Sequence, residues 1–182
     1  MKKVFVFFVL YFAFSSPLSA TEPPRIDGVR TTYDSELRFS FYVSGAFKKD
    51  LEDAINSGMP TSFTYVVKLY RKKNMWLDEQ LGSWKFNHTV KYDALKQEYQ
   101  VNIEEKNSIE TTKDFDVAKA MMVTGNDVII SPIPALKKNE VYELKLMAEL
   151  DVVRIPSVFK YLFFFVKLWD FKTDWYSHEF TI

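Results

Sequence analysis

The chain contains no cysteine, only five glycines and only two histidines. Without cysteine it has no disulfide bond and no thiolate metal ligand, so burial of apolar side chains has to hold the fold together. With so few glycines, no glycine-rich phosphate-binding loop can be drawn. His88 and His178 each lie in an alternating strand pattern, where we expect a surface or cross-strand packing residue. We therefore predict no metal site and no cofactor.

The chain also lacks an excess of either charge and a recognisable catalytic motif. Its 24 Lys and Arg residues balance 24 Asp and Glu residues, and no long run of like charge occurs. A nucleic-acid partner requires a basic surface, so we predict none. No serine lies in a G-x-S-x-G motif. Asp114 and Asp116 lie at a helix start, where we expect them to cap the helix. We predict no catalytic residue and no enzyme, although carboxylates from distant strands would be invisible in the sequence.

Residues 1–20 have the layout of a cleavable secretory signal peptide. The basic pair Lys2-Lys3 precedes an unbroken apolar run at residues 4–14, and Ala20 offers a small residue before the cut. The run is about half of the ~20 residues that a membrane-spanning helix needs, and retention as an anchor is the competing interpretation. We expect export to the periplasm or cell envelope. The mature chain, residues 21–182, is long enough for one domain with its own core.

Alternating apolar residues predict about eight strands. Residues 37–44 place an apolar side chain at every second position, which is the pattern of a half-buried strand. Residues 141–152 show the same alternation over the longest distance, and we expect one face on a core and the other in water. The remaining strands are expected at residues 25–32, 63–69, 84–92, 99–103, 128–130 and 175–182.

Three short helices are expected between these strands. Residues 47–57 change to a helical period, and Gly58 is placed to stop that helix. A second helix is expected at residues 114–123, ended by Gly125, and a third at residues 158–169. Strands dominate and do not alternate regularly with helices. We therefore predict a mainly β fold, an antiparallel β-sandwich of about eight strands with two or three short helices.

The most apolar stretch of the mature chain begins at Val158 and ends at Trp169. It is too short to span a bilayer. Three interpretations remain open: a buried helix that closes the sandwich, an interaction surface for an envelope protein, and a foot in the membrane interface. The candidate interaction surface consists of Phe163, Phe164, Phe165, Trp169 and Trp175.

Three blocks of residues resemble a known family. They are Gly58-Met59-Pro60 with Phe63, Tyr65, Leu69-Tyr70-Arg71 and Trp76; Tyr92-Asp93 with Leu95 and Tyr99; and Pro156 with Leu168-Trp169-Asp170-Phe171 and Thr173-Asp174-Trp175-Tyr176. In these blocks the chain resembles the bacterial domain-of-unknown-function family 4390, whose members are small exported proteins. The resemblance implies export and a single domain, and supplies no catalytic residue or ligand. Members are often encoded near membrane sensor kinases, which implies an envelope partner by association.

Two main functional hypotheses follow. The first is a non-enzymatic, exported envelope protein that acts as a binding or protein-interaction module. The alternative is a lipid- or membrane-surface-binding protein that makes a peripheral membrane contact through the segment from Val158 to Trp169. A carbohydrate-binding sandwich that uses exposed Trp76, Trp84 or Trp175 is a third class of binding module.

Overall fold

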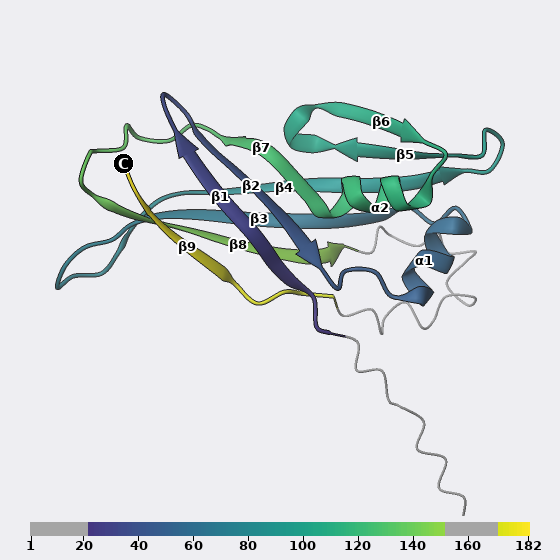
Figure 1. Ribbon diagram of the computed structural model, residues 1–182, viewed down its shortest axis with the longest axis horizontal. Coiled ribbons are helices and arrows are strands. Elements are labelled where there is room, and N and C mark those ends of the chain that lie inside the picture. Colours follow the sequence, from purple (N-terminus) through teal and green to yellow (C-terminus); the bar gives the residue numbers. More distant parts are fainter. Residues whose placement is uncertain (1–21, 152–170) are drawn as a thin grey trace, which may run out of the picture.

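Two antiparallel β-sheets form the body of the protein in a computed structural model (Figure 1). The structure describes residues 22–151 and 171–182. The smaller sheet has the strand order β1-β2-β7, and the larger has the order β6-β5-β4-β3-β8-β9. The predicted mainly β antiparallel sandwich with short helices is confirmed, with nine strands in the described part of the chain instead of about eight. The predicted signal peptide and the predicted helix at residues 158–169 lie outside the described residues.

Each predicted strand in the described residues is present. The smaller sheet contains β1 (Arg25–Tyr33), β2 (Leu37–Ser44) and β7 (Thr124–Ile130). The larger sheet contains β3 (Thr61–Arg71), β4 (Glu79–Asp93), β5 (Glu98–Ile103), β6 (Ser108–Thr112), β8 (Val141–Asp151) and β9 (Tyr176–Thr181). The helical elements are α1 (Lys49–Asn56), the short 3₁₀ helix η1 (Glu104–Lys106) and α2 (Phe115–Val123).

The core lies between the inner faces of the two sheets. The alternating residues of β2 are buried there, and Phe41 places its ring 4.9 Å from the ring of Tyr65 on β3 and 6.5 Å from that of Phe86 on β4. Tyr65 and Phe86 stack on each other at 5.3 Å. Because each such aromatic side chain contributes roughly 1.5–3 kcal/mol when buried, this cluster is a main source of stability in a chain without disulfides.

The two α-helices begin and end with local signals in the sequence. Helix α1 ends at Asn56, and Gly58 stops it as predicted: this glycine has a φ of +89° and donates its N–H to Ile55 O, while Met59 N donates to Ala54 O. This pair of bonds is the Schellman motif, and its left-handed residue favours glycine. Asp114 caps α2, because its carboxylate accepts the N–H groups of Asp116 and Val117.

Three local predictions are corrected by the structure. Gly125 does not end α2: the helix ends at Val123 and continues directly into β7, in which Gly125 makes room for the ring of Phe41. Strand β6 was not predicted, because residues 108–112 contain one large apolar residue, Ile109, and show no alternation; in the structure Ile109 is exposed. The face of β8 that was expected in water contains buried Glu143, which lies 3.7 Å from Lys72 Nζ.

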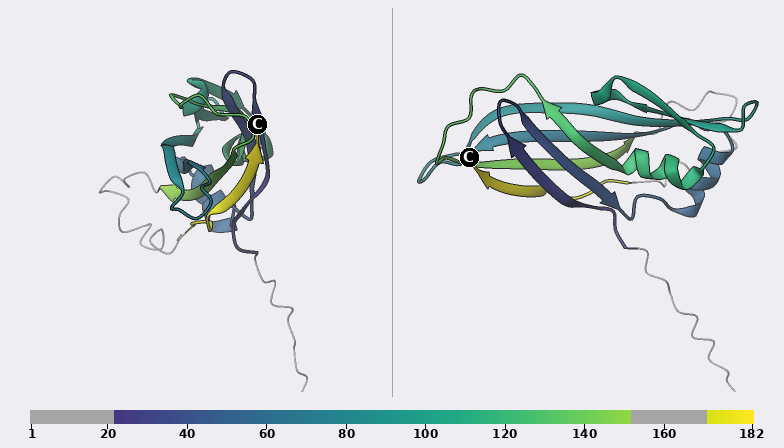
Figure 2. Two further views of the ribbon diagram at one scale, coloured as in Figure 1. Left: turned by 90° about the vertical axis from the view of Figure 1, so that its left-hand side faces the viewer. Right: turned by 45° about the horizontal axis from the view of Figure 1, so that its top comes forward.

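The long hairpin of β3 and β4 gives the molecule two distinct ends. Figures 1 and 2 show the loop that joins β3 to β4 projecting past both sheets at one end, while α1 and the β4–β5 turn lie at the other. The two strands are paired from Thr61↔Val90 to Arg71↔Glu79. The loop therefore extends from two paired strands that run the full length of the larger sheet.

Substitution of Gly125 by alanine is expected to lower the free energy of unfolding by about 1–3 kcal/mol, the usual effect of overpacking a core. A Cβ atom at this position would lie 2.1 Å from a ring carbon of buried Phe41. Urea denaturation measures the change. Asn126→Ala, at an exposed position of the same strand, is the matched control and should change stability by less than about 0.5 kcal/mol. Equal stability of the two variants would contradict the proposed packing.

Candidate functional site

The loop between β3 and β4 carries three consecutive large apolar side chains that are almost fully exposed. The relative exposure is 100% for Met75, 79% for Trp76 and 84% for Leu77. We call these three residues the β3–β4 tip. A run of three exposed apolar residues is unfavourable in a folded protein unless it serves a contact. The tip is therefore the strongest candidate site in the described part of the chain.

The base of this loop is closed by Asp78. Its carboxylate accepts the backbone N–H of Lys73 at 3.2 Å and the Nζ of Lys72 at 2.9 Å. The backbone N–H of Lys72 donates to Val141 O at 2.9 Å, which ties the loop to β8. Met75 has a φ of 65°, and this left-handed conformation lies in the turn that reverses the chain. The loop thus has a fixed base and an exposed apolar end.

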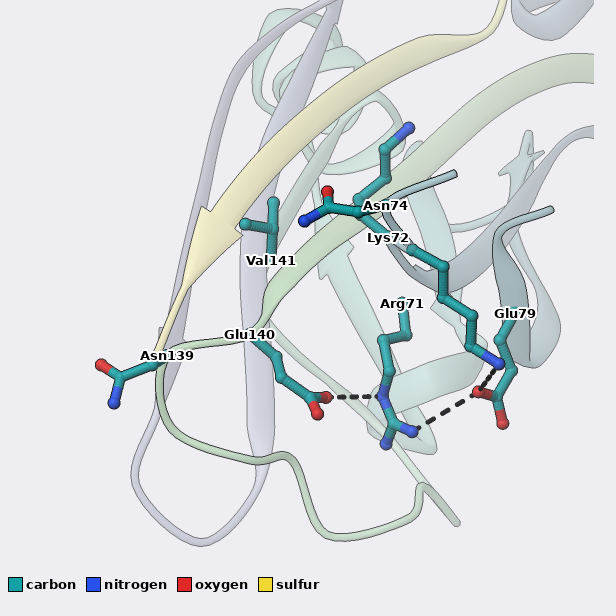
Figure 3. Close-up of a pocket in the computed structure, with 8 residues that line it drawn as sticks. Arg71, Lys72, Asn74, Glu79, Asn139, Glu140 and Val141 are labelled. Carbon is teal, nitrogen blue, oxygen red and sulfur yellow. Dashed lines mark hydrogen bonds and ion pairs between the residues drawn. The ribbon is translucent and has the colours of Figure 1, made fainter. Parts of the chain in front are cut away.

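Below the tip, three basic and three acidic side chains form ion pairs with one another. We call this set the charged collar: Arg71, Lys72, Lys73, Asp78, Glu79 and Glu140. Arg71 points between two carboxylates, with its Nε 2.7 Å from Glu140 and its Nη1 3.4 Å from Glu79 (Figure 3). A hydrogen bond from Lys73, and the positive charge of that ammonium, lower the pKa of Glu79. Each of the six side chains has an ion-pair partner within the collar, and Lys72 also lies 3.7 Å from Glu143 and 3.8 Å from Glu179, so the collar carries no excess of positive charge.

A polar pocket of about 360 Å³ lies among the side chains of the collar. It is lined by Arg71, Lys72, Lys73, Asn74, Glu79, Asn139, Glu140 and Val141. Pockets for small molecules are mostly apolar with a few polar groups. Here the charged groups already pair with one another, so the pocket is a weaker candidate than the apolar tip above it.

Of the five residues predicted as an interaction surface, the structure describes one. Trp175 is 42% exposed, and Lys68 Nζ lies 4.8 Å from the centre of its ring. The other four, Phe163, Phe164, Phe165 and Trp169, lie outside the described residues, so the interpretations of that segment remain predictions.

The three tryptophans considered for carbohydrate binding lie in different settings. Trp76 is exposed at the tip, whereas Trp84 is half-buried on β4 and donates its ring N–H to Ser131 O at 3.1 Å. Trp175 precedes β9 and lies against Lys68 of β3. Within the described residues no aromatic contact joins these rings, so they do not form one stacking platform.

His88 and Glu105 form a buried polar pair that has the residue types of a catalytic site. The His88 side chain is fully buried, and its Nε2 lies 3.0 Å from both oxygens of Glu105. Its Nδ1 lies 3.1 Å from the carbonyl oxygens of Met121 and Met122 at the end of α2. Both ring nitrogens thus face acceptors, which leaves neither for a substrate or metal. The pair ties η1 and α2 to β4, which is a packing role.

His178 also packs across strands, since its Nε2 lies 3.3 Å from Thr31 Oγ1 on β1. In residues 22–151 and 171–182 no group of three or more metal-ligating side chains is arranged around one point.

The apolar tip was missed at the level of sequence, although a signal for it was present. In the sequence, Trp76 enters only in the family resemblance and as one of three tryptophans that could bind carbohydrate, and no role is assigned to Met75 or Leu77. The informative pattern is the position of Met75 to Leu77 between charged residues at a strand-to-strand turn. Apolar residues in such a turn have no adjacent strand face on which to pack.

Replacement of His88 by leucine is expected to lower the free energy of unfolding by about 3–5 kcal/mol, because it leaves the Glu105 carboxylate buried without its partner. The double variant H88L/E105L removes that unpaired charge and should recover part of the loss. Chemical denaturation of the two variants and the parent gives the comparison. A double variant as unstable as H88L would show that burial of the charge is not the cause.

The closed base of the loop is expected to persist in mild acid. The hydrogen bonds from Lys72 and from the backbone of Lys73 lower the pKa of Asp78 below its usual 3.8. A lowered carboxyl pKa means that the contact is present above pH 3.8 and is lost only as the pH falls through the lower value. An NMR titration of the Asp78 carboxyl should give a midpoint below 3.8, and Lys72→Met should raise it. A midpoint at or above 3.8 in the parent would contradict the closed base.

Comparisons with known proteins identify a family and nothing more specific. No helix in the described residues is long and apolar enough to cross a membrane. No curated protein and no solved structure matches the chain. The family model described as "Domain of unknown function (DUF4390)" matches residues 28–179, from within β1 to within β9. The resemblance predicted from the three residue blocks is confirmed, and the chain belongs to this family.

Proposed function

We propose that this protein is an exported, non-enzymatic binding module of the cell envelope and that the β3–β4 tip is its contact element. The observation that carries the proposal is the near-complete exposure of Met75, Trp76 and Leu77 on a loop with a fixed base. Exposed apolar groups of this kind are rare on soluble monomers and mark contact sites. Tryptophan in particular is enriched among residues that dominate binding energy.

The energetics fit a reversible contact. Burial of one large apolar side chain is worth roughly 1.5–3 kcal/mol, so the three together supply about 5–9 kcal/mol before the costs of association. Those costs are several kcal/mol, which leaves a weak or moderate affinity. The charged collar needs no new partners when the tip is covered, because its ions are already paired. It can therefore act as the polar rim of an apolar contact.

Export is supported by the signal-peptide pattern of residues 1–20, and the family resemblance implies it as well. The non-enzymatic assignment is supported by the lack of a catalytic motif in the sequence. It is also supported by the geometry of His88, whose two nitrogens are engaged by Glu105 and by the end of α2.

A photo-crosslinking amino acid at position 76 tests the proposal in intact cells. We expect it to label an envelope component, because the tip is covered when the protein is bound. The matched control is the same probe at Leu95, which is 98% exposed in the β4–β5 turn at the opposite end of the molecule and should label nothing specific (Figure 1). Equal labelling from both positions, or retention of the chain in the cytoplasm, would count against the proposal.

A further inference from the structure

We infer that the β3–β4 tip inserts into the interfacial region of a lipid bilayer. This inference rests on the proposed function and names the partner of the same site. Two properties of the tip support a membrane in preference to a protein surface: the directions in which it is exposed and the depth of its apolar part. The balance of charge below the tip indicates which lipids it would bind.

The tip is exposed on more than one side. Successive residues of an extended or turning chain point in different directions, and each of Met75, Trp76 and Leu77 is at least 79% exposed. A flat protein surface would cover one side only. Three side chains, even at the 150–250 Å² that a large aromatic can bury, offer less than about 750 Å², below the roughly 800 Å² per partner of a stable protein interface. Lipid surrounds a protruding loop without needing a matching pocket.

The apolar part of the loop has the depth of an interfacial contact. Residues 74–77 lie between Lys73 and Asp78, both of which belong to the charged collar. One arm holds the polar Asn74 and Met75, and the other holds Trp76 and Leu77; at the extended-strand rise of about 3.3 Å per residue, an upper limit for a turn, each arm reaches at most roughly 7 Å. Amphipathic helices that lie in the interface bury their apolar face about 5–10 Å into the boundary of headgroups and acyl chains, so the tip is long enough to reach the same depth. Tryptophan is enriched at that boundary, which suits Trp76.

The charged collar would then lie at the level of the headgroups. Its three basic and three acidic side chains are paired with one another, so it offers no excess positive charge to anionic lipid. The attraction must come from burial of the apolar tip. Binding is therefore expected on zwitterionic vesicles and is expected to change little with salt.

Flotation with phosphatidylcholine vesicles is the first measurement, with protein purified from the envelope fraction of producing cells. The parent protein should float with the vesicles. The variant M75S/W76S/L77S should bind at least tenfold more weakly, whereas Leu95→Ser should bind as the parent does. Because the tip is exposed, circular dichroism should show the same fold for all three proteins.

A fluorescent label reports insertion directly. The chain has no cysteine, so Met75→Cys and Leu95→Cys each create a single attachment site for a polarity-sensitive dye. On addition of vesicles the emission of the dye should shift to the blue at position 75 and stay unchanged at position 95. A shift at both positions, or at neither, would overturn the inference.

The outcomes separate this inference from the proposed function. Flotation that is equal for parent and tip variant overturns the membrane contact, as does binding that needs anionic lipid and disappears in 0.5 M salt. If vesicles do not bind but the crosslinker at position 76 captures an envelope protein, the partner is a protein and the proposed function stands. If neither vesicles nor an envelope component are bound through position 76, both proposals fail.

Discussion

The packing of β2 onto β3 and β4 is the contact on which the rest of the structure depends. Phe41 of the smaller sheet meets Tyr65 and Phe86 of the larger one, and the Tyr65 hydroxyl donates to Met122 O at the end of α2. Burial, with a smaller contribution from Glu105, raises the pKa of Tyr65 far above its usual value, so the hydroxyl stays a donor. His88 on β4 approaches the same carbonyl group, with its Nδ1 3.1 Å from Met122 O. One aromatic cluster thus fixes both sheets and α2 without any disulfide.

The packing of this core explains how the apolar β3–β4 tip stays exposed to water. The β3–β4 ladder is anchored at its centre by buried Tyr65 and Phe86 and continues to the pair Arg71↔Glu79. Beyond that pair the ionised Asp78 closes the loop, and the tip has no sheet beneath it. The exposed triplet thus lies at the end of a hairpin whose base is held by strand pairing and by Asp78, and its exposure to water is unfavourable.

The two charged regions of the molecule have different consequences because their surroundings differ. Around the loop, the ion pairs are partly exposed and screened, so they position the tip more than they stabilise the fold. In the core, His88 and Glu105 are both buried, and the loss of either partner leaves an uncompensated charge. His88, a residue type common in catalytic sites, thus has a packing role in this structure. The candidate site is instead the β3–β4 tip, a turn without catalytic side chains.

Local patterns in the sequence determined the elements. The alternation of residues 37–44 predicted β2, the cap at Asp114 and the stop at Gly58 predicted the helix ends, and the three residue blocks predicted the family. The strand and helix signals each depend on neighbours within a few positions, whereas the family resemblance depends on short blocks spread along the chain. The tertiary structure alone decided that β6 pairs at a sheet edge, that His88 is enclosed, and that Met75 to Leu77 face water. Exposure depends on which distant segments cover a residue, and an apolar triplet has the same composition in a core strand as on a projecting loop.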